Sequence, residues 1–194
     1  MALKKKKTYS AVVIGVSAGG LNALSYLLPK IPEGYKIPII IIQHRNTDQR
    51  DLLEEILQEK CKIVLKQADE KEKVKSGIVY LGPPDYHLLI EKDESFSLSS
   101  DAKVKYSRPS IDVLFESASY VYQDKLLGII LTGANNDGTN GIMRISKNGG
   151  HTIAQNPQEA EFPFMPQAAI SSGFVKNVFS LVEIKNFLLT INTD

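Results

Sequence analysis

Three polar side chains stand directly after apolar runs, each at a position where a buried strand would end. Ser17 follows a valine-rich run, His44 follows the isoleucine-rich run 37–42 and Gln43, and Asp137 lies in a Gly-Asn turn after a third run. Ligands of open α/β sheets bind outside the carboxyl ends of the strands, where the strand order reverses. A serine, a histidine and an aspartate delivered to that edge form the set that acyl transfer needs. The pattern therefore predicts a serine hydrolase.

The serine lies in segment 15–19, Gly-Val-Ser-Ala-Gly, which fits the G-x-S-x-G nucleophile motif between a strand and a helix. Glycine beside the serine permits a tight turn, and N–H groups of the following turn, with that of Ala18 as a candidate, would face a developing oxyanion. The glycines at 15–20 also suit a phosphate-binding loop, so a nucleotide-binding protein is an alternative. The second glycine of the dinucleotide fingerprint is absent, and His44 stands where its acidic residue is expected, which favours a hydrolase.

His44 is one of three histidines, and a histidine at the end of an isoleucine run is not expected in the core. It can act as general base toward Ser17 if the two strands are neighbours. We interpret His87 and His151 as structural, with His87 as the reserve base. No group of histidines and cysteines has metal-ligand spacing, so we expect no metal site.

Asp137 has two interpretations. The glycines and asparagines of segment 133–138 allow unusual backbone dihedrals and can return a carboxylate to the strand end, where it would orient the imidazole and stabilise its protonated form. Alternatively, Asp137 caps a helix that begins near Thr139. The sequence does not separate the two. The rival carboxylates, each with an ordinary turn or helix explanation, are Asp48, Asp85 and Asp112.

One arginine is a candidate for binding substrate. Arg108 precedes Pro109 and Ser110 at a predicted helix start, where it could hold a carboxylate or a carbonyl of a substrate. A surface arginine at a turn explains the same residue equally well.

Alternation of strand, glycine turn and helix predicts an α/β fold with a doubly wound, mostly parallel sheet between helix layers, a Rossmann-like three-layer arrangement. In the middle of the chain, three short apolar runs separated by turn residues predict antiparallel strands or an inserted hairpin at 77–81, 87–90 and 96–98. The other strands are expected at 10–16, 37–42, 61–65, 126–131 and 151–154. Helices are expected at 21–28, 48–60, 110–122, 141–147 and 181–189.

Composition limits the class of protein. The chain has 194 residues, of which 43% are hydrophobic and 23% charged, so we expect one domain over 9–194 after a basic tail at 1–8. A net charge of +1 disfavours general binding to nucleic acid. The lone Cys61 excludes an internal disulfide, and no apolar stretch reaches the roughly 18 residues of a membrane span, so we expect a cytoplasmic protein without membrane insertion. The lysine run of the tail is interpreted as solvated, with a tether to an acidic partner as the alternative.

With these residues in view, the chain resembles the catalytic domain of the CheB-type chemotaxis receptor methylesterases, from about Tyr9 to the last predicted helix. The order Ser, His, Asp differs from that of the usual α/β-hydrolases. The matching segments are 14–20 (IGVSAGG), 43–44 (QH), 107–115 (SRPSIDVLF), 130–138 (ILTGANNDG), 152–155 (TIAQ) and 165–166 (MP).

The resemblance implies a Ser17–His44–Asp137 triad that hydrolyses glutamate γ-methyl esters on the cytoplasmic helices of chemoreceptors and deamidates receptor glutamines, with no cofactor. Ser17 would attack the ester carbonyl, methanol would leave with a proton from His44, and water would then free the glutamate. A catalytically silent adaptor that docks on the receptor is the other alternative.

The sequence departs from the family pattern in four places. Most members carry an N-terminal receiver domain, whereas about eight residues precede the first predicted strand here, so control by phosphorylation of this chain itself is not expected, and a separate regulatory protein is a candidate partner. Ala134 replaces a common methionine, and its backbone N–H remains a candidate donor to the oxyanion. Arg45 also replaces a methionine and adds a positive charge at the cleft rim, and His151 occupies a position that is often aromatic.

Overall fold

A computed structural model describes residues 7–45 and 52–192. Its strands are β1 (Ala11–Val16), β2 (Ile39–Gln43), β3 (Val64–Gln67), β4 (Ile78–Leu81), β5 (His87–Ile90), β6 (Phe96–Ser99), β7 (Leu126–Ile130), β8 (His151–Gln155) and β9 (Asn177–Phe179). Its α-helices are α1 (Gly20–Leu27), α2 (Leu53–Gln58), α3 (Ile111–Tyr122), α4 (Thr139–Lys147), α5 (Phe164–Ser171) and α6 (Leu181–Ile191). None of the helices in these ranges is long and apolar enough to cross a membrane.

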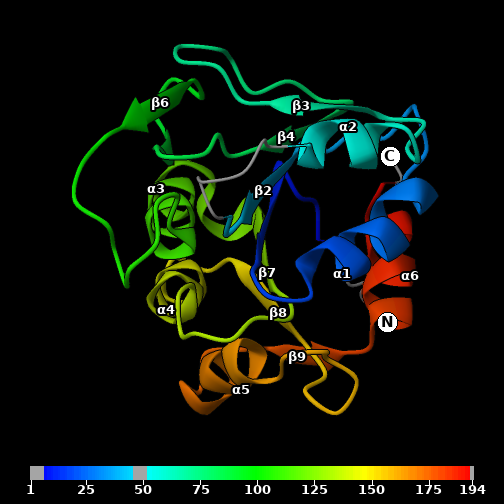
Figure 1. The fold of residues 1–194 in the computed structure, drawn as a ribbon, viewed down its shortest axis with the longest axis vertical. Helices are drawn as coiled ribbons and strands as arrows, with labels where there is room; N and C mark the ends of the chain where they lie inside the picture. The colour runs from blue at the N-terminus through cyan, green and yellow to red at the C-terminus, as the bar shows by residue number, and fades with distance from the viewer. Residues whose placement is uncertain (1–6, 46–51, 193–194) are drawn as a thin grey trace, which may run out of the picture.

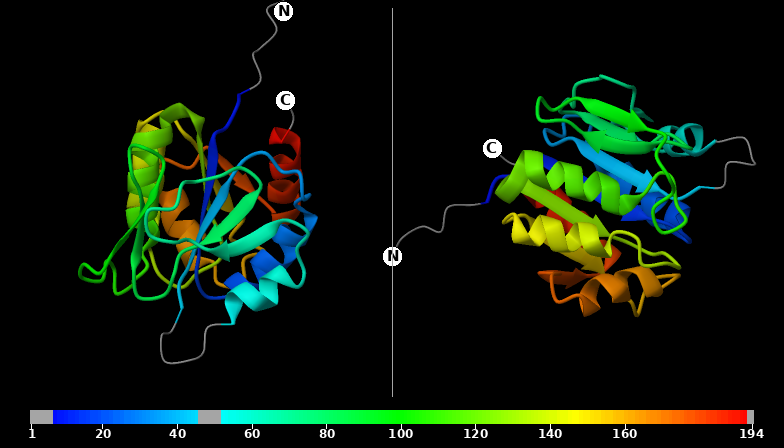
Figure 2. Two further views of the ribbon diagram at one scale, coloured as in Figure 1. Left: turned by 90° about the horizontal axis from the view of Figure 1, so that it is seen from above. Right: turned by 90° about the vertical axis from the view of Figure 1, so that its left-hand side faces the viewer.

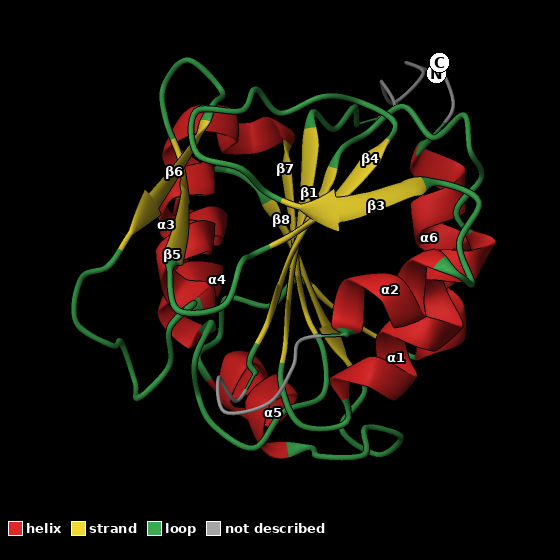
Figure 3. Ribbon diagram, turned by 45° about the horizontal axis from the view of Figure 1, so that its top comes forward, coloured by secondary structure: helices red, strands yellow, loops and turns green. Residues whose placement is uncertain are grey.

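In the described part of the chain, seven strands form one sheet in the order β3-β4-β2-β1-β7-β8-β9, and every neighbouring pair is parallel (Figure 1). Helices α1, α2 and α6 cover one face, and α3, α4 and α5 cover the other (Figure 3). The stack of α3, α4 and α5 is seen from outside in the right panel of Figure 2. This is the doubly wound three-layer fold that the alternation of elements predicts.

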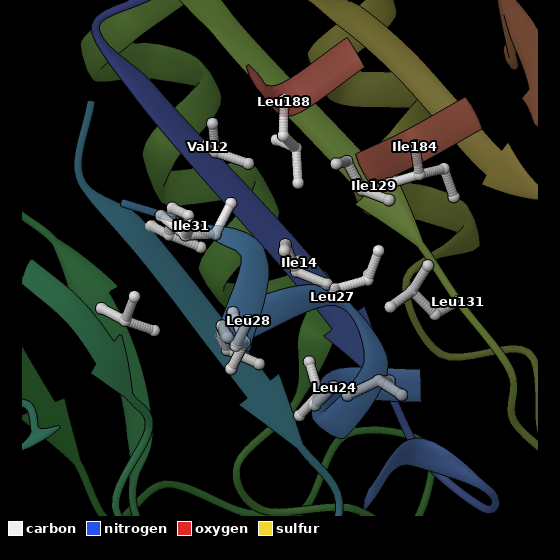
Figure 4. Close-up of a cluster of buried hydrophobic side chains, with 14 of the residues drawn as sticks. Val12, Ile14, Leu24, Leu27, Leu28, Ile31, Ile129, Leu131, Ile184 and Leu188 are labelled. Atoms are coloured by element: carbon white, nitrogen blue, oxygen red, sulfur yellow. The ribbon is translucent and has the colours of Figure 1, made fainter. Parts of the chain in front are cut away.

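The core explains why the central strands are apolar throughout. Successive side chains of a strand point to opposite faces of the sheet, and both faces are covered by helices here. Thus Val12 and Ile14 pack with Leu24 and Leu27 of α1 and with residues of α6 (Figure 4), whereas Val13 packs on the α3 side. A strand buried on both faces needs no polar alternation, as the sequence of β1 and β2 shows.

The order of the strands defines the edge where a site can form. The chain leaves β1 through α1 toward β2 on one side, while β7 pairs with β1 on its other side and continues through α4 to β8. Connections therefore diverge from β1 and β7, and the crevice at their carboxyl ends is a topological switch point. Ser17, His44 and Asp137 follow β1, β2 and β7 at this edge.

The structure corrects the prediction for the middle of the chain. Of the three runs, β4 belongs to the parallel sheet, between β2 and β3, whereas β5 and β6 form an antiparallel pair in a separate two-stranded sheet beside α3. Turn residues flank β4 as they flank β5, and this pattern alone does not distinguish a strand of a parallel sheet from a strand of a hairpin. Helix α5 and strand β9 were not predicted; Pro166 lies in the first turn of α5, where a helix tolerates proline, and β9 has only three residues.

Other differences concern boundaries and single residues. The third strand lies at 64–67 and not at 61–65, and the predicted helix 48–60 is observed as Leu53–Gln58, with 48–51 outside the described residues. Residues 1–6 of the predicted tail also lie outside them. In the first predicted helix, Leu21 is 40% exposed, whereas Leu24 and Leu27 are fully buried.

His151 on β8 is buried between two polar partners. Its Nδ1 accepts a hydrogen bond from the Tyr9 hydroxyl at 2.6 Å, and its Nε2 donates to Asn177 Oδ1 at 2.7 Å. Burial lowers the pKa of His151 below its usual value, the hydrogen bond to Asn177 opposes this, and the charges of Lys176 and Lys7 lower it further. The folded protein therefore favours the neutral imidazole.

We expect this histidine to make the folded state less stable in mild acid. A lowered pKa in the folded state contributes stability that is complete above the unfolded pKa of about 6.5 and is lost as the pH falls below it. Between about pH 7.5 and about pH 5.5, the free energy of unfolding should drop more for the unsubstituted protein than for His151→Gln, which keeps a donor and an acceptor but does not titrate. Urea denaturation at both pH values measures the two losses, and equal losses would contradict the expectation.

Candidate active site

The structure brings the three predicted side chains together. Because β2 and β7 both pair with β1, the residues that follow these strands converge at one edge. His44 Nδ1 lies 3.2 Å from Ser17 Oγ, and His44 Nε2 lies 2.8 Å from Asp137 Oδ2. A hydroxyl, an imidazole and a carboxylate are thus in hydrogen-bond contact in series, which is the geometry required for base-assisted nucleophilic attack.

The two ring nitrogens of His44 have exchanged partners relative to the serine proteases, in which Nε2 faces the serine and Nδ1 faces the aspartate. Here Nδ1 faces Ser17 and Nε2 faces Asp137. A ring turned by half a rotation would present carbon atoms to both partners, so the two contacts together fix the orientation. Since a carboxylate only accepts, the neutral ring carries its hydrogen on Nε2 and leaves the Nδ1 lone pair for the serine.

The turn that carries Ser17 is set by its neighbours. The positive φ of this turn falls on Gly19, at 75°, and Ser17 is not among the described residues with a positive φ, so the turn is not a strained nucleophile elbow. A Cβ on Gly20 would lie 2.0 Å from Gln43 Oε1. The amide of Gln43 needs that space, because its Nε2 donates to the carbonyls of Ser17 and His44, both at 2.9 Å. Gln43 therefore joins the nucleophile turn to the end of β2.

Asp137 is the most densely bonded group of the site, and its side chain is fully buried. Besides His44, its carboxylate accepts hydrogen bonds from the Ser110 hydroxyl and from the N–H groups of Ile111, Asp112 and Gly138. Burial would raise the pKa of this carboxyl, but the hydrogen bonds and charge of His44 and the backbone donors outweigh it and lower the pKa. Asp137 is therefore a carboxylate at neutral pH.

These bonds combine the two interpretations of Asp137 in an unexpected way. The carboxylate does cap a helix, but the helix is α3, which begins 26 residues earlier in the chain than Asp137. The N-cap residue of α4 is Gly138, with no side-chain cap. Ser110 is the N-cap of α3, yet its hydroxyl donates to Asp137 and does not cap the helix itself. One carboxylate thus satisfies the start of α3 and holds the imidazole.

The rival carboxylates have other partners. Asp112 Oδ1 accepts from Gly141 N at 2.8 Å, and its Oδ2 pairs with Lys105 Nζ at 2.8 Å. Burial raises the pKa of Asp112, and the negative charge of Asp137 adds to this, although Lys105 and Gly141 act in the opposite direction. Asp85 lines the cleft in front of Ser17, and Asp48 lies outside the described residues.

A polar cleft of about 440 Å³ opens in front of the serine. Among the described residues that line it, Arg45, Lys103 and Arg108 are cations and Asp85 is a carboxylate. Arg108 donates to the carbonyls of residues 100 and 101 at 2.7 and 3.0 Å, so its guanidinium also fastens its own loop. The cleft is also lined by Ser17, Ala18, His44, Tyr106, Ser107, Pro109 and Asn135.

The two candidate oxyanion donors lie in different surroundings. Ala18 lines the cleft beside Ser17, whereas Ala134 is exposed and lines a separate apolar hollow with Phe162 and Phe164. Glu161 lines the hollow formed by segment 17–22, where its carboxylate accepts from Asn22 at 2.9 Å. An acidic group at this glycine loop disfavours the phosphate-binding alternative.

The other predicted histidine is held away from the cleft. His87 accepts from Ser110 N at 3.1 Å and donates to the carbonyl of residue 102 at 3.1 Å, and it is buried. Both ring nitrogens are therefore used in fixing the start of α3 and its preceding loop. Among the residues with described positions, no group of three His, Cys, Asp or Glu side chains could hold a metal ion.

Sequence reasoning missed three polar residues that contact the site. They are Gln43, which fixes the turn, and Asn135 and Ser107, whose side chains lie 3.2 and 3.4 Å from His44 Nδ1. Gln43 directly precedes His44, and Asn135 lies two positions before Asp137. This closeness in sequence to predicted catalytic residues is the signal that could have indicated them. Nothing local marks Ser107, because its contact spans 63 positions of the chain.

Comparison with known proteins finds close relatives. A family model described as CheB methylesterase matches residues 12–188. A protein of Leptospira interrogans, provisionally named a protein-glutamate methylesterase/protein-glutamine glutaminase, is 50% identical over 184 residues, which is 95% of each chain. The protein-glutamate methylesterase/protein-glutamine glutaminase of Thermotoga maritima is 31% identical over 183 residues, which is 93% of this chain and 53% of that protein.

The fold agrees with these matches. The crystal structure of the Thermotoga maritima CheB methylesterase catalytic domain aligns with a TM-score of 0.90 and 30% identity, over 95% of this chain and 99% of that domain. The present chain therefore spans about half the length of the whole Thermotoga maritima protein.

Removing the Asp137 carboxylate should weaken the fold as well as the site. Asp137→Ala leaves buried N–H groups at the start of α3 without an acceptor, so we expect the free energy of unfolding to fall by about 2–4 kcal/mol. Ser17→Ala, which removes a hydroxyl at the cleft surface, should change it by less than about 0.5 kcal/mol. Urea denaturation of both variants measures the difference. An Asp137→Ala variant as stable as Ser17→Ala would show that the helix cap contributes little.

Proposed function

Because the chain belongs to the CheB methylesterase family, we propose that it removes methyl esters from glutamate side chains of chemoreceptors and deamidates receptor glutamines, as a serine hydrolase of chemotaxis signalling. The observation that supports this most is the contact series from Ser17 through His44 to Asp137 at the ends of three adjacent parallel strands. Ser17 acts as nucleophile, His44 as general base and acid, and Asp137 as the group that orients the imidazole.

The reaction follows from this geometry. Ser17 Oγ attacks the ester carbonyl carbon, its proton passes to His44 Nδ1, and the carbonyl electron pair moves onto the oxygen. When the oxyanion collapses, the C–OCH₃ bond breaks and methanol leaves with the proton from Nδ1. Water then attacks the acyl-enzyme with Nδ1 as base, and the proton returns to Ser17 as glutamate is released. Asp137 stays ionised throughout and stabilises the protonated ring.

Deamidation uses the same steps with a different leaving group. A glutamine side chain would give ammonia in place of methanol, because His44 Nδ1 can protonate the departing nitrogen. No additional residue is needed for the second activity.

The cleft suits a protein substrate. It is open and polar, and its described lining residues include three cations and one carboxylate, which matches a segment that carries glutamates beside the ester. We infer that the protein works in the cytoplasm on the cytoplasmic helices of receptors, and we propose a separate regulatory protein as a further partner. The Ala18 and Ala134 N–H groups are proposed as oxyanion donors, and Arg108 as a group that positions the rim of the cleft.

Methanol release from a methylated receptor tests the proposal. Wild-type protein should release methanol, and Ser17→Ala should reduce the rate by about 10⁴-fold or more, because the nucleophile is lost while the fold is kept. Ser25→Ala, which removes a hydroxyl from α1 outside the cleft, is the matched control and should keep the wild-type rate. Near-normal turnover by Ser17→Ala, or no turnover by wild-type protein, would refute the proposed function, and the second result would favour the adaptor.

A further inference from the structure

Three donors converge on one atom of the imidazole. Ser17 Oγ and Asn135 Nδ2 each lie 3.2 Å from His44 Nδ1, and Ser107 Oγ lies 3.4 Å from it. A neutral imidazole has one lone pair, and here it is on Nδ1, because Nε2 donates to Asp137. The donors therefore share a single acceptor, and at most one can make a strong bond to it at a time.

The orientation of the Asn135 amide is fixed from its other end. Its Oδ1 accepts a hydrogen bond from Asp137 N at 3.0 Å. A flipped amide would place its NH₂ against that N–H and its oxygen against the Nδ1 lone pair, two repulsive contacts in place of two attractive ones. Asn135 therefore presents N–H groups to the reaction centre, and it lines the same cleft as Ser17.

We propose that Asn135 is a catalytic residue whose amide N–H donates to His44 Nδ1 in the resting enzyme and to the substrate oxyanion after attack. This rests on the proposed function. When Ser17 adds to the carbonyl carbon, its proton forms an N–H bond at Nδ1 and uses the lone pair, so Asn135 loses its acceptor. In the same step the carbonyl electron pair moves to oxygen and creates a new acceptor in the cleft beside Ser17.

The exchange reverses when the intermediate collapses. The proton on Nδ1 passes to the leaving methoxide oxygen, the lone pair returns, and Asn135 can donate to it again. The amide N–H is thus bound in the resting state and available when negative charge develops, which is the condition for differential stabilisation of the transition state. This gives the site a side-chain donor in addition to the backbone N–H groups of two alanines, Ala18 and Ala134.

Substitution of Asn135 with separate readouts for binding and chemistry tests the proposal. Asn135→Asp keeps an oxygen acceptor for Asp137 N but removes the donor, and Asn135→Ala removes both. For methanol release from methylated receptor, both variants should lower kcat by about 10²-fold with KM nearly unchanged, the effect of losing one oxyanion donor. Asn136→Ala, a neighbouring exposed asparagine of the same turn, is the control and should keep the wild-type kcat.

A second measurement does not depend on the receptor. Reaction of Ser17 with a small fluorophosphonate needs the base and the oxyanion donors, so Asn135→Ala and Asn135→Asp should be labelled about 10²-fold more slowly than wild type. Urea denaturation identifies any variant whose loss comes from unfolding.

The outcomes separate this inference from the proposed function. Wild-type kcat or a wild-type labelling rate in folded Asn135→Asp would overturn the role of Asn135 and leave the esterase assignment intact. If wild-type protein does not release methanol but Ser17 is labelled, the esterase assignment fails, and the labelling rates of the Asn135 variants still decide the role of the amide.

Discussion

The site depends on one buried negative charge, the carboxylate of Asp137. Burying a carboxylate without partners would destabilise the folded state by several kcal/mol, so the surrounding structure must supply hydrogen-bond donors to it. Three backbone N–H groups, the Ser110 hydroxyl and His44 do so, and the start of α3 adds the positive end of its dipole. The same contacts join the turn after β7, the start of α3 and the end of β2. Catalytic geometry and local stability are consequently properties of one cluster.

Close packing between helix and sheet makes that cluster possible. Helix α3 starts directly over β1 and the turn after β7, because Ile111 lies against two residues without side chains. A Cβ on Gly15 would lie 2.4 Å from Ile111 Cγ2, and one on Gly138, whose φ is 92°, would lie 2.8 Å from the same atom. The glycine of the serine motif that precedes Ser17 by two positions therefore serves helix packing, while Gly19 provides the turn.

The sequence was sufficient for features that are local. Strand ends after apolar runs located Ser17, His44 and Asp137, and α3 lies within the predicted helix 110–122, with Ile111, Leu114 and Phe115 fully buried. It was insufficient where a contact spans the chain. The partners of Asp137 at the start of α3 and the contact of Ser107 with His44 depend on how β1, β2 and β7 are ordered, which no short window contains. For the same reason β4 was given the wrong partners, since its flanking turns resemble those of a hairpin.

The ring orientation of His44 has a further consequence for how the site is organised. With Nε2 bound to a fully buried carboxylate, only Nδ1 faces the cleft, and every polar group in reach must share it. In a site of this kind a neighbouring donor such as Asn135 opposes the nucleophile in the resting state, because it competes for the base. Asn135 can assist only after His44 Nδ1 is protonated. Its contribution therefore depends on the distance between its amide and Nδ1 and on an amide that keeps one orientation. The Asp137 N–H fixes the orientation of the amide by donating a hydrogen bond to Asn135 Oδ1. Asp137 therefore acts on both sides of the imidazole: its carboxylate binds Nε2, and its backbone N–H orients the amide beside Nδ1.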